Sequence, residues 1–245
     1  MSARSCWRPV DKPGLSPGDA NLFPARFDFG KEASRQGEGH LATLVLHEYA
    51  VSGNCYKIRL IAALLGLALE RREYDIMQGE TRTRDFLVNV NANGRIPVLQ
   101  VGDRFIPESN AACFYLAEGT SLVPEDRFDR ADILRWMFWE QYSHEPNVAT
   151  LRFWHGWIGE ENWTEAQRIQ LPGKRAAGEA ALKLMDDHLA THDFLVGGRL
   201  SVADIALYAY THVAEDGGFT LADYPAVQAW LDRVVATPGY IPLSA

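Results

Sequence analysis

The chain has 245 residues, of which 47% are hydrophobic and 23% charged, a composition typical of a soluble globular protein. Its formal net charge of −8 argues against nucleic acid or an anionic membrane surface as the main partner, because both favour clustered lysine and arginine. No run approaches the roughly 18 apolar residues of a membrane span, and the start of the chain lacks the apolar core of a signal peptide. The three cysteines, Cys6, Cys55 and Cys113, have neither disulfide-framework nor metal-ligand spacing, so we expect no metal and a reducing cytoplasm.

The first 119 residues divide into an irregular extension and a region of alternating strands and helices. Residues 1–40 contain several prolines and glycines without a sustained period, which predicts a disordered or irregular extension. Residues 41–119 are expected to form strands at 41–46, 70–76, 96–101 and 104–106, and helices at 55–65, 84–90 and from 109 onward. This order, β-α-β-α-β-β-α, predicts an α/β thioredoxin-like N-terminal domain with a mixed sheet covered by helices.

A linker at residues 120–128 precedes a region, 129–245, that we predict to be an all-α C-terminal helical domain. Pro146 is expected to break or kink the chain, and His144-Glu145-Pro146 is expected to be an ordinary loop, since adjacent side chains do not share a helix face. Ser201 and Asp204 frame a capping box before a nearly all-apolar run, which predicts a buried structural helix. The expected helices cover residues 129–145, 148–157, 175–190, 205–210 and 225–235.

Ser52 occupies the position where redox enzymes of this fold place the first cysteine of Cys-x-x-Cys, and the slot reads Ser52-Gly53-Asn54-Cys55. A serine forms no disulfide, but at a helix N-terminus its hydroxyl is a donor that stabilises a ligand's thiolate. Ser52 also fits a purely structural role as the helix cap, and both interpretations stand. Asn54 is either a second donor or a loop residue, and Cys55 fits a small buried hydrophobe better than a reactive thiol.

A second group of candidate residues lies within residues 93–112. Pro97 interrupts an apolar run otherwise typical of a strand, and a cis Ile96–Pro97 bond would turn the backbone groups of Ile96 outward to pair with an extended peptide. Glu108 and Ser109 open a helix, which places a hydroxyl and free backbone N–H groups at a positive dipole end suited to a carboxylate. Glu108 suits either an amine or the helix dipole. The segment predicts a small ligand with a peptide-like middle and a carboxylate tail.

Four segments together resemble the glutathione S-transferase family, closest to bacterial cytosolic members and the serine-type theta and zeta classes. They are Ser52-Gly53-Asn54-Cys55-Tyr56-Lys57-Ile58-Arg59-Leu60, Asn93-Gly94-Arg95-Ile96-Pro97-Val98-Leu99, Glu108-Ser109-Asn110-Ala111 and Ser201-Val202-Ala203-Asp204. Over roughly residues 44–235 the resemblance implies a thioredoxin-like domain followed by an all-helical domain, a cytoplasmic homodimer, and glutathione as co-substrate. No nucleic-acid or membrane partner is expected, on the basis of the net charge, and detoxification of electrophiles is the setting that the resemblance implies.

The resemblance also implies roles for individual residues. Ser52 matches the serine that activates the glutathione sulfur, and Ile96 before cis-Pro97 matches the residue that pairs with the cysteinyl backbone. Glu108 and Ser109 match the residues that hold the γ-glutamyl end. The full implied glutathione-binding set is Ser52, Asn54, Arg95, Ile96, Pro97, Glu108 and Ser109.

Two departures from the family pattern concern the other end of glutathione. Arg95 stands where relatives often carry Gln or Lys, and the segment 78–81 lacks the Lys or His that commonly approaches the glycyl carboxylate. Activation by Tyr49 in place of Ser52 is a minor alternative. The second substrate is expected against an aromatic wall, whereas Trp136 and Phe138 are expected to be interhelical core. The expected pocket residues are Tyr49, Trp139, Tyr142, His144, Phe153 and Trp154.

Three functional hypotheses follow. The first is transfer of glutathione, activated by Ser52, onto a small, partly hydrophobic electrophile. The second is a glutathione-binding or regulatory protein of the same fold with little turnover. The third, a thiol–disulfide oxidoreductase, is disfavoured because Ser52 replaces the attacking cysteine. The family scaffold is shared by transferase, isomerase and dehalogenase chemistry, so the electrophile stays open.

Overall fold

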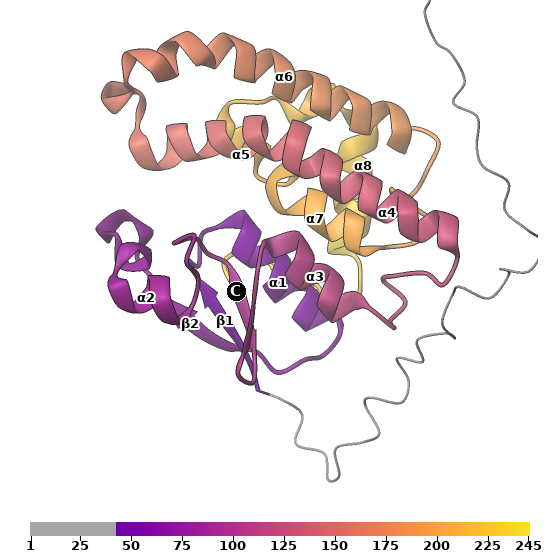
Figure 1. The fold of residues 1–245 in the computed structure, drawn as a ribbon. Helices are drawn as coiled ribbons and strands as arrows, with labels where there is room; N and C mark the ends of the chain where they lie inside the picture. The colour runs from indigo at the N-terminus through magenta and orange to yellow at the C-terminus, as the bar shows by residue number, and fades with distance from the viewer. Residues whose placement is uncertain (1–42) are drawn as a thin grey trace, which may run out of the picture. The chain divides into compact units, whose positions relative to one another are not determined.

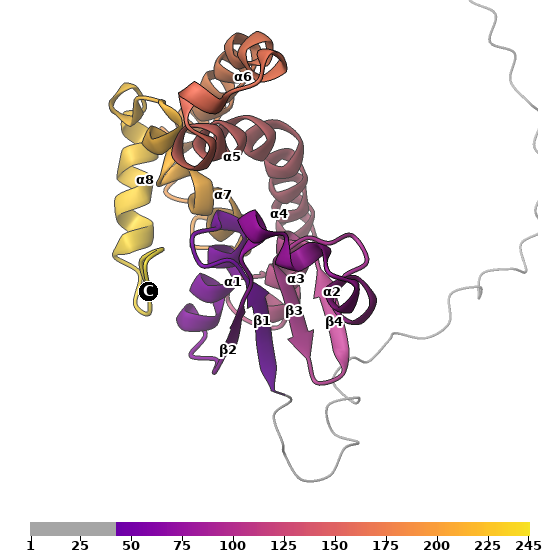
Figure 2. The same cartoon turned by 90° about the vertical axis from the view of Figure 1, so that its left-hand side faces the viewer.

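The computed structural model describes residues 43–245 of the chain. The extension expected at residues 1–40 lies outside the described residues. Residues 44–107 contain a four-stranded sheet with the strand order β2-β1-β3-β4 (Figure 2). The strands are β1 (Leu44–Glu48), β2 (Glu70–Glu73), β3 (Val98–Val101) and β4 (Arg104–Pro107).

The sheet is mixed, as predicted for a thioredoxin-like domain. β1 pairs parallel with β2 and antiparallel with β3, and β3 pairs antiparallel with β4. A parallel pair requires a crossover connection, which α1 (Gly53–Leu64) supplies between β1 and β2. The turn between β3 and β4 is tight because Gly102 adopts a φ of 61°, which glycine tolerates without a steric cost.

Two helices of the thioredoxin-like half contact the helical half. α1 and α3 (Ser109–Ala117) pack against each other, and both also contact α7 (Val202–Thr211) of the helical half. α1 begins at Gly53, two residues earlier than expected, because Ser52 caps it. The short helix α2 (Arg84–Asn89) is anchored by Phe86, whose buried ring meets that of Tyr74 edge-on.

The remainder of the described chain is mostly helical, with α5 packed along α6 (Figure 1). Its long helices are α4 (Arg127–Trp139), α5 (Glu145–Phe153), α6 (Glu165–Leu189), α7 and α8 (Pro225–Val235). Short turns complete the structure: η1 (Ile76–Gln78), η2 (Glu80–Arg82), η3 (Glu140–His144), η4 (Trp154–Ile158), η5 (Glu160–Asn162), η6 (Ala214–Gly217) and η7 (Leu221–Asp223). The all-helical second half is therefore confirmed.

The capping box before α7 fixes the centre of the helical half. Each oxygen of the buried Asp204 carboxylate accepts two hydrogen bonds. Oδ2 receives the Ser201 N–H and hydroxyl at 2.8 and 2.7 Å, and Oδ1 receives the Leu195 N–H and Trp230 Nε1, both at 2.9 Å. Because four donors satisfy the carboxylate, α7 is buried along its whole length without an unpaired charge, as the sequence predicts.

Three expectations about the helical half are wrong. The segment 144–146 is not a loop, since α4 passes through the π-helical turn η3 directly into α5, and Pro146 lies in the first turn of α5. Phe138 is not core but 71% exposed, whereas Trp136 is buried. α6 begins at Glu165 rather than residue 175, because Thr164 and Gln167 form a capping box that the sequence reading missed.

Candidate functional site

A cavity of about 350 Å³ opens between the loop that follows β1 and the helices α5 and α7. This volume falls within the range of small-molecule sites. The thioredoxin-like half contributes Tyr49, Val51, Ser52, Ile76 and Ile96, and the helical half contributes Gln141, Glu145, Pro146, Ala149, Thr150, Arg152, Phe153, Trp157 and Tyr210. The cavity therefore brings the start of α1, the loop before β3 and two helices of the second half to one place.

Ser52 caps α1 and lines the cavity at the same time. Its Oγ accepts a hydrogen bond from the Cys55 N–H at 3.4 Å, and its backbone is extended, as an N-cap requires. The hydroxyl proton is not used by this bond, because the oxygen is the acceptor. The capping role and a donor role toward a ligand are thus compatible in one residue.

Cys55 is a buried hydrophobe, as expected. Its side chain is 0% exposed, and burial raises the pKa of its thiol to about 12. The Tyr49 N–H donates to Sγ at 3.4 Å, which does not offset burial. A thiol that stays protonated at neutral pH is a poor nucleophile, which argues against the oxidoreductase hypothesis.

The Ile96–Pro97 peptide bond is cis, and Ile96 lines the cavity while Pro97 is buried. Arg95, next to it, is exposed, and its carbonyl accepts a hydrogen bond from Asn91 Nδ2 at 2.9 Å. The side chain of Arg95 is therefore open to solvent, while the backbone around it is held in place.

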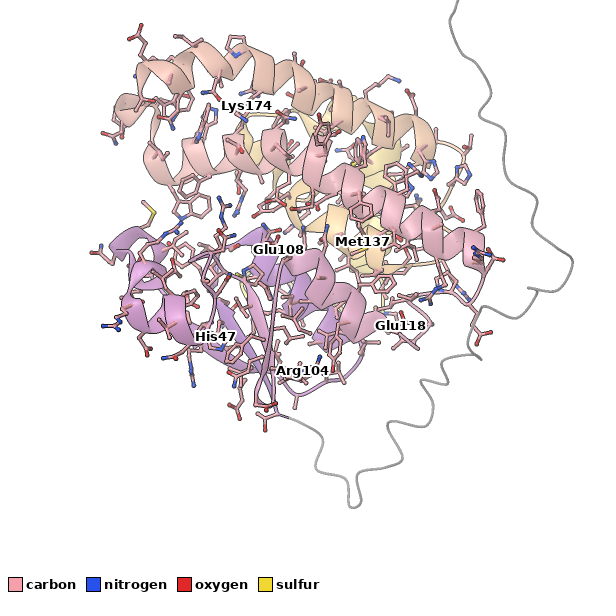
Figure 3. The ribbon with its side chains drawn as sticks, in the orientation of Figure 1. His47, Arg104, Glu108, Glu118, Met137 and Lys174 are labelled. Carbon is pink, nitrogen blue, oxygen red and sulfur yellow. The ribbon has the colours of Figure 1, made fainter. Side chains whose placement is uncertain are left out.

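Glu108 and Ser109 stand at the start of α3, where Figure 3 labels Glu108. Glu108 has a φ of 69°, the left-handed region that non-glycine residues rarely adopt, so the surrounding structure holds this residue in a strained conformation. Ser109 is only 5% exposed, and its hydroxyl donates to Asn54 Oδ1 at 3.1 Å. The Asn54 amide thereby links the candidate residues at the start of α1 to those at the start of α3.

A buried charge network, which the sequence reading missed, lies behind these residues. Lys57 on α1 is fully buried, and its Nζ lies 2.9 Å from Oε1 of the equally buried Glu140. The same Nζ donates to Asn110 Oδ1 at 3.2 Å and to Ser109 Oγ at 3.5 Å, and lies 3.9 Å from Glu145 Oε2. Burial alone lowers the pKa of Lys57, but Glu140 and Glu145 outweigh it and raise the pKa above its ordinary value.

Glu145 connects that network to the cavity. Its Oε1 accepts from Asn54 Nδ2 at 2.9 Å, and its Oε2 accepts from Gln141 Nε2. Asn54 therefore hydrogen-bonds both Ser109 and Glu145, one residue away from Gly53 and two from Ser52. The start of α3, the start of α1 and the start of α5 are held together by polar contacts.

Tyr210 on α7 is a second residue that sequence reasoning missed. Its hydroxyl accepts from the Asn54 N–H at 3.3 Å, and its ring lines the cavity. A Cβ on Gly53 would lie 2.6 Å from this ring, so glycine is needed there for the close approach of α7. The nearly all-apolar context of Tyr210 in the sequence gave no signal beyond burial.

The expected second-substrate residues are distributed over several environments. Tyr49 and Phe153 line the cavity. Trp139 packs edge-on against Trp136, His144 is fully buried against Thr211, and Trp154 is 8% exposed and hydrogen-bonds Trp163 through its carbonyl. Tyr142 is 87% exposed. The aromatic wall of this cavity is instead formed by Phe153 and Trp157, whose rings stack 6.1 Å apart.

A thioredoxin-like half with a cis-proline loop, joined to a helical half through a shared cavity, defines a fold of the glutathione-transferase type. Residues 44–118 match the family model of the glutathione S-transferase N-terminal domain, and residues 155–238 match that of the C-terminal domain. The chain therefore belongs to the glutathione S-transferase family.

Individual relatives agree with this assignment. The structure is similar to that of a glutathione S-transferase from Pseudomonas fluorescens, with 42% identity and a TM-score of 0.78 over 83% of this chain and 100% of the other. A possible glutathione S-transferase from Rhodopseudomonas palustris is 45% identical, with a TM-score of 0.78 over 82% of this chain and 90% of the other. Among curated proteins, glutathione S-transferase 2 of Anopheles gambiae is 29% identical over 77% of this chain and 88% of its own length.

Proposed function

We propose that the protein is an enzyme that transfers glutathione to small, partly hydrophobic electrophiles, with Ser52 as the residue that activates the glutathione sulfur. A free thiol with a pKa of about 8.5 is only about 3% ionised at pH 7. A hydrogen bond from the Ser52 hydroxyl to the thiolate, worth about 1.5 to 3 kcal/mol, lowers that pKa by roughly one to two units. The dipole of α1 adds about 0.3 to 1 kcal/mol in the same direction.

The observation that carries this proposal is the shared position of Ser52 and Ile96 on one cavity, with Ser109 linked to it through Asn54. Glutathione has a thiol, a peptide-like middle and a γ-glutamyl carboxylate, and these three residues match its three parts in order. In the proposed binding mode Pro97 presents the backbone of Ile96 to the cysteinyl residue, and Glu108 and Ser109 hold the γ-glutamyl end. Arg95, which is exposed, remains a candidate for the glycyl carboxylate.

The second substrate is proposed to enter against the apolar side of the same cavity. Tyr49, Ile76, Phe153 and Trp157 offer carbon surface in the cavity that Ser52 also lines. Attack of the thiolate sulfur on the electrophilic carbon forms a C–S bond and releases the leaving group. The resulting thioether is more polar than the electrophile, which is consistent with a role in detoxification.

The proposed enzyme is a homodimer in the cytoplasm. An apolar groove of about 650 Å³ between α3 and α4 supports the dimer, because exposed apolar surface of this kind marks contact sites between proteins. Cys55 and Cys113 are both free and buried, which suits a reducing compartment. Among residues 43–245, no helix is both long and apolar enough to cross a membrane.

The test is conjugation of glutathione to a model electrophile by the wild type and by Ser52→Ala, with Ser52→Thr as the matched control that keeps a hydroxyl. At near-neutral pH we expect Ser52→Ala to lower kcat about 10- to 100-fold, while the affinity for glutathione, measured by calorimetry, changes far less. The bound thiol should titrate roughly one to two pH units higher in Ser52→Ala. Because loss of a cap costs about 1 kcal/mol, unfolding curves check that the variant is folded.

Other outcomes assign the function differently. Wild-type affinity for glutathione without turnover would indicate a binding or regulatory protein, and absence of both would end the glutathione proposal. Full activity in Ser52→Ala, together with inactivity in Tyr49→Phe, would transfer the activating role to Tyr49.

A further inference from the structure

We propose that Arg152 makes the electrophile site selective for substrates that carry a carboxylate. The proposal rests on the proposed function, since it concerns the second substrate of the same cavity. Arg152 lies on α5, lines the cavity, and is only 7% exposed. A guanidinium in such a position is held largely out of water, where its interaction with an anion is stronger than on the surface.

The contacts of Arg152 fix the guanidinium and leave one edge free. Nη1 donates to the Val51 carbonyl at 3.1 Å, and Nε donates to Asp216 Oδ2 at 3.1 Å. No hydrogen bond from Nη2 is found to any residue of 43–245, and arginine carries two N–H donors on that atom. The free donors belong to a side chain that lines the cavity, and Val51, whose carbonyl anchors it, directly precedes Ser52.

An aromatic ring lies beside the guanidinium. The Arg152 Cζ lies 4.7 Å from the centroid of the Trp157 ring, and the Trp157 ring stacks on Phe153. The cation–π attraction at this distance restrains the position of the guanidinium in the cavity wall. The cavity thus combines an aromatic face for a planar substrate body with an oriented cation for an anionic substituent.

The neighbouring charges do not cancel this preference. Asp216 pairs with Arg152, but its side chain is 55% exposed and its charge is therefore screened by water. Glu145 is the carboxylate that lines the cavity, and it is occupied by Asn54, Gln141 and the positive charge of Lys57. Arg152 is consequently the cation in the cavity lining whose Nη2 donors are available to a ligand.

The test compares two chloroarenes of nearly the same shape, the anionic 4-chloro-3,5-dinitrobenzoate and the neutral 4-chloro-3,5-dinitrobenzamide. In both reactions the glutathione sulfur forms a bond to the ring carbon, chloride leaves with the electron pair of the C–Cl bond, and the thiol proton passes to solvent. Each kcat/KM is divided by the uncatalysed rate constant, which removes the difference in intrinsic reactivity. We expect the wild type to prefer the benzoate by roughly tenfold or more.

Four variants separate charge recognition from a structural effect. Arg152→Met should lower the benzoate-to-benzamide ratio to about one, and Arg152→Lys should keep part of the preference because it keeps the charge. Asp216→Asn should raise the ratio, because it removes the competing carboxylate and leaves an amide oxygen for Nε. Arg175→Met is the matched control: Arg175 donates to the carbonyls of Gly217 and Gly218, beside Asp216, but does not line the cavity, so the ratio should stay as in the wild type.

The outcomes distinguish this proposal from the one on which it rests. Equal use of both compounds by the wild type, or an unaltered ratio in Arg152→Met, would overturn the carboxylate preference while leaving the transferase function intact. A raised KM for glutathione in Arg152→Met without a change in the ratio would assign Arg152 to glutathione and also overturn the proposal. If neither compound is conjugated by the wild type although glutathione is bound, both proposals fail together.

Discussion

At the scale of single residues, His144 shows how burial sets a protonation state. The imidazole is fully buried, and its Nε2 lies 3.0 Å from the Thr211 hydroxyl. Burial, and to a lesser extent the positive charge of Lys57, lower the pKa of His144 to about 3, although Glu145 opposes them. The folded protein therefore holds His144 neutral at pH values between about 5 and 7, whereas an unfolded chain protonates histidine near pH 6.5.

This difference predicts a pH-dependent stability that belongs to one residue. Below about pH 6.5 the unfolded state binds a proton that the folded state does not, so the free energy of unfolding falls as pH falls, by about 1.4 kcal/mol per pH unit, until the pH approaches the folded value. The free energy of unfolding is measured in urea at pH 7 and at pH 5. We expect its fall between these two pH values to be about 2 kcal/mol smaller in His144→Gln than in the wild type. His192→Gln, at an exposed histidine, is the control and should follow the wild type. Parallel pH profiles for the wild type and His144→Gln would contradict the prediction.

The site residues that the sequence predicted are those with a local signature. Ser52 sits in a recognisable slot at a helix start, Pro97 interrupts an apolar run, and Ser109 opens a helix, so each is visible within a few positions. Lys57 and Tyr210 were missed because their partners lie far away in the chain, Glu140 at a separation of 83 residues and Asn54 at 156. Such contacts exist only after the two halves have packed.

At the scale of elements, the boundaries were predicted best where caps are explicit. α8 runs from Pro225 to Val235 as expected, because proline begins it and Pro238 follows. The run from α4 to α5 was misjudged because proline was taken to end a helix, whereas Pro146 stands in the first turn after a π-helical segment. That π turn contains Glu140 and thereby supplies the partner of Lys57, which makes the irregularity part of the site.

The pair of Lys57 and Glu140 predicts strong coupling between α1 and the α4–α5 run. Lys57→Met leaves a buried carboxylate without its cation, and Glu140→Gln leaves a buried ammonium with a weaker partner, so each should cost about 3 to 5 kcal/mol of unfolding free energy. The double variant should cost clearly less than the sum, because neither charge is then left alone. Urea unfolding of the four proteins measures this coupling.

An exposed ion pair is the control for this comparison of single and double variants. Lys183 and Asp187 pair on the surface of α6, so replacing either should change stability little and without coupling. If the double variant of Lys57 and Glu140 loses as much unfolding free energy as the two single variants together, the buried pair does not couple α1 to the α4–α5 run.

At the scale of the whole chain, the sequence predicted the two-part architecture because the period of apolar residues changes from mixed to helical after residue 120. It did not predict which surfaces the helices leave open. Phe138 was expected to be core because it lies in a dense aromatic run, yet it is 71% exposed on α4. Periodicity assigns a residue to a helix face, but only packing decides whether a second element covers that face.

That open face carries the last prediction, the proposed homodimer. The α3–α4 groove is lined by Tyr115, Leu134 and Phe138 among others, and Glu108, Glu118 and Met137 mark its course in Figure 3. Because the groove includes Glu108, which adjoins Ser109, a partner chain seated there would also adjoin the proposed γ-glutamyl site. In light scattering, the wild type should have twice the chain mass of 27.4 kDa. Phe138→Glu should shift the protein toward the monomer, since a carboxylate loses hydration in an apolar contact.

Phe128→Glu is a closely matched control for that experiment. Phe128 is also an exposed phenylalanine of α4, at 78%, but it does not line the groove, so this variant should stay dimeric. Dissociation should also weaken glutathione binding in Phe138→Glu, because the rim next to Glu108 loses its cover, while Phe128→Glu keeps the wild-type affinity. A wild type with the mass of one chain, or identical masses for the two variants, would refute dimerisation through this groove.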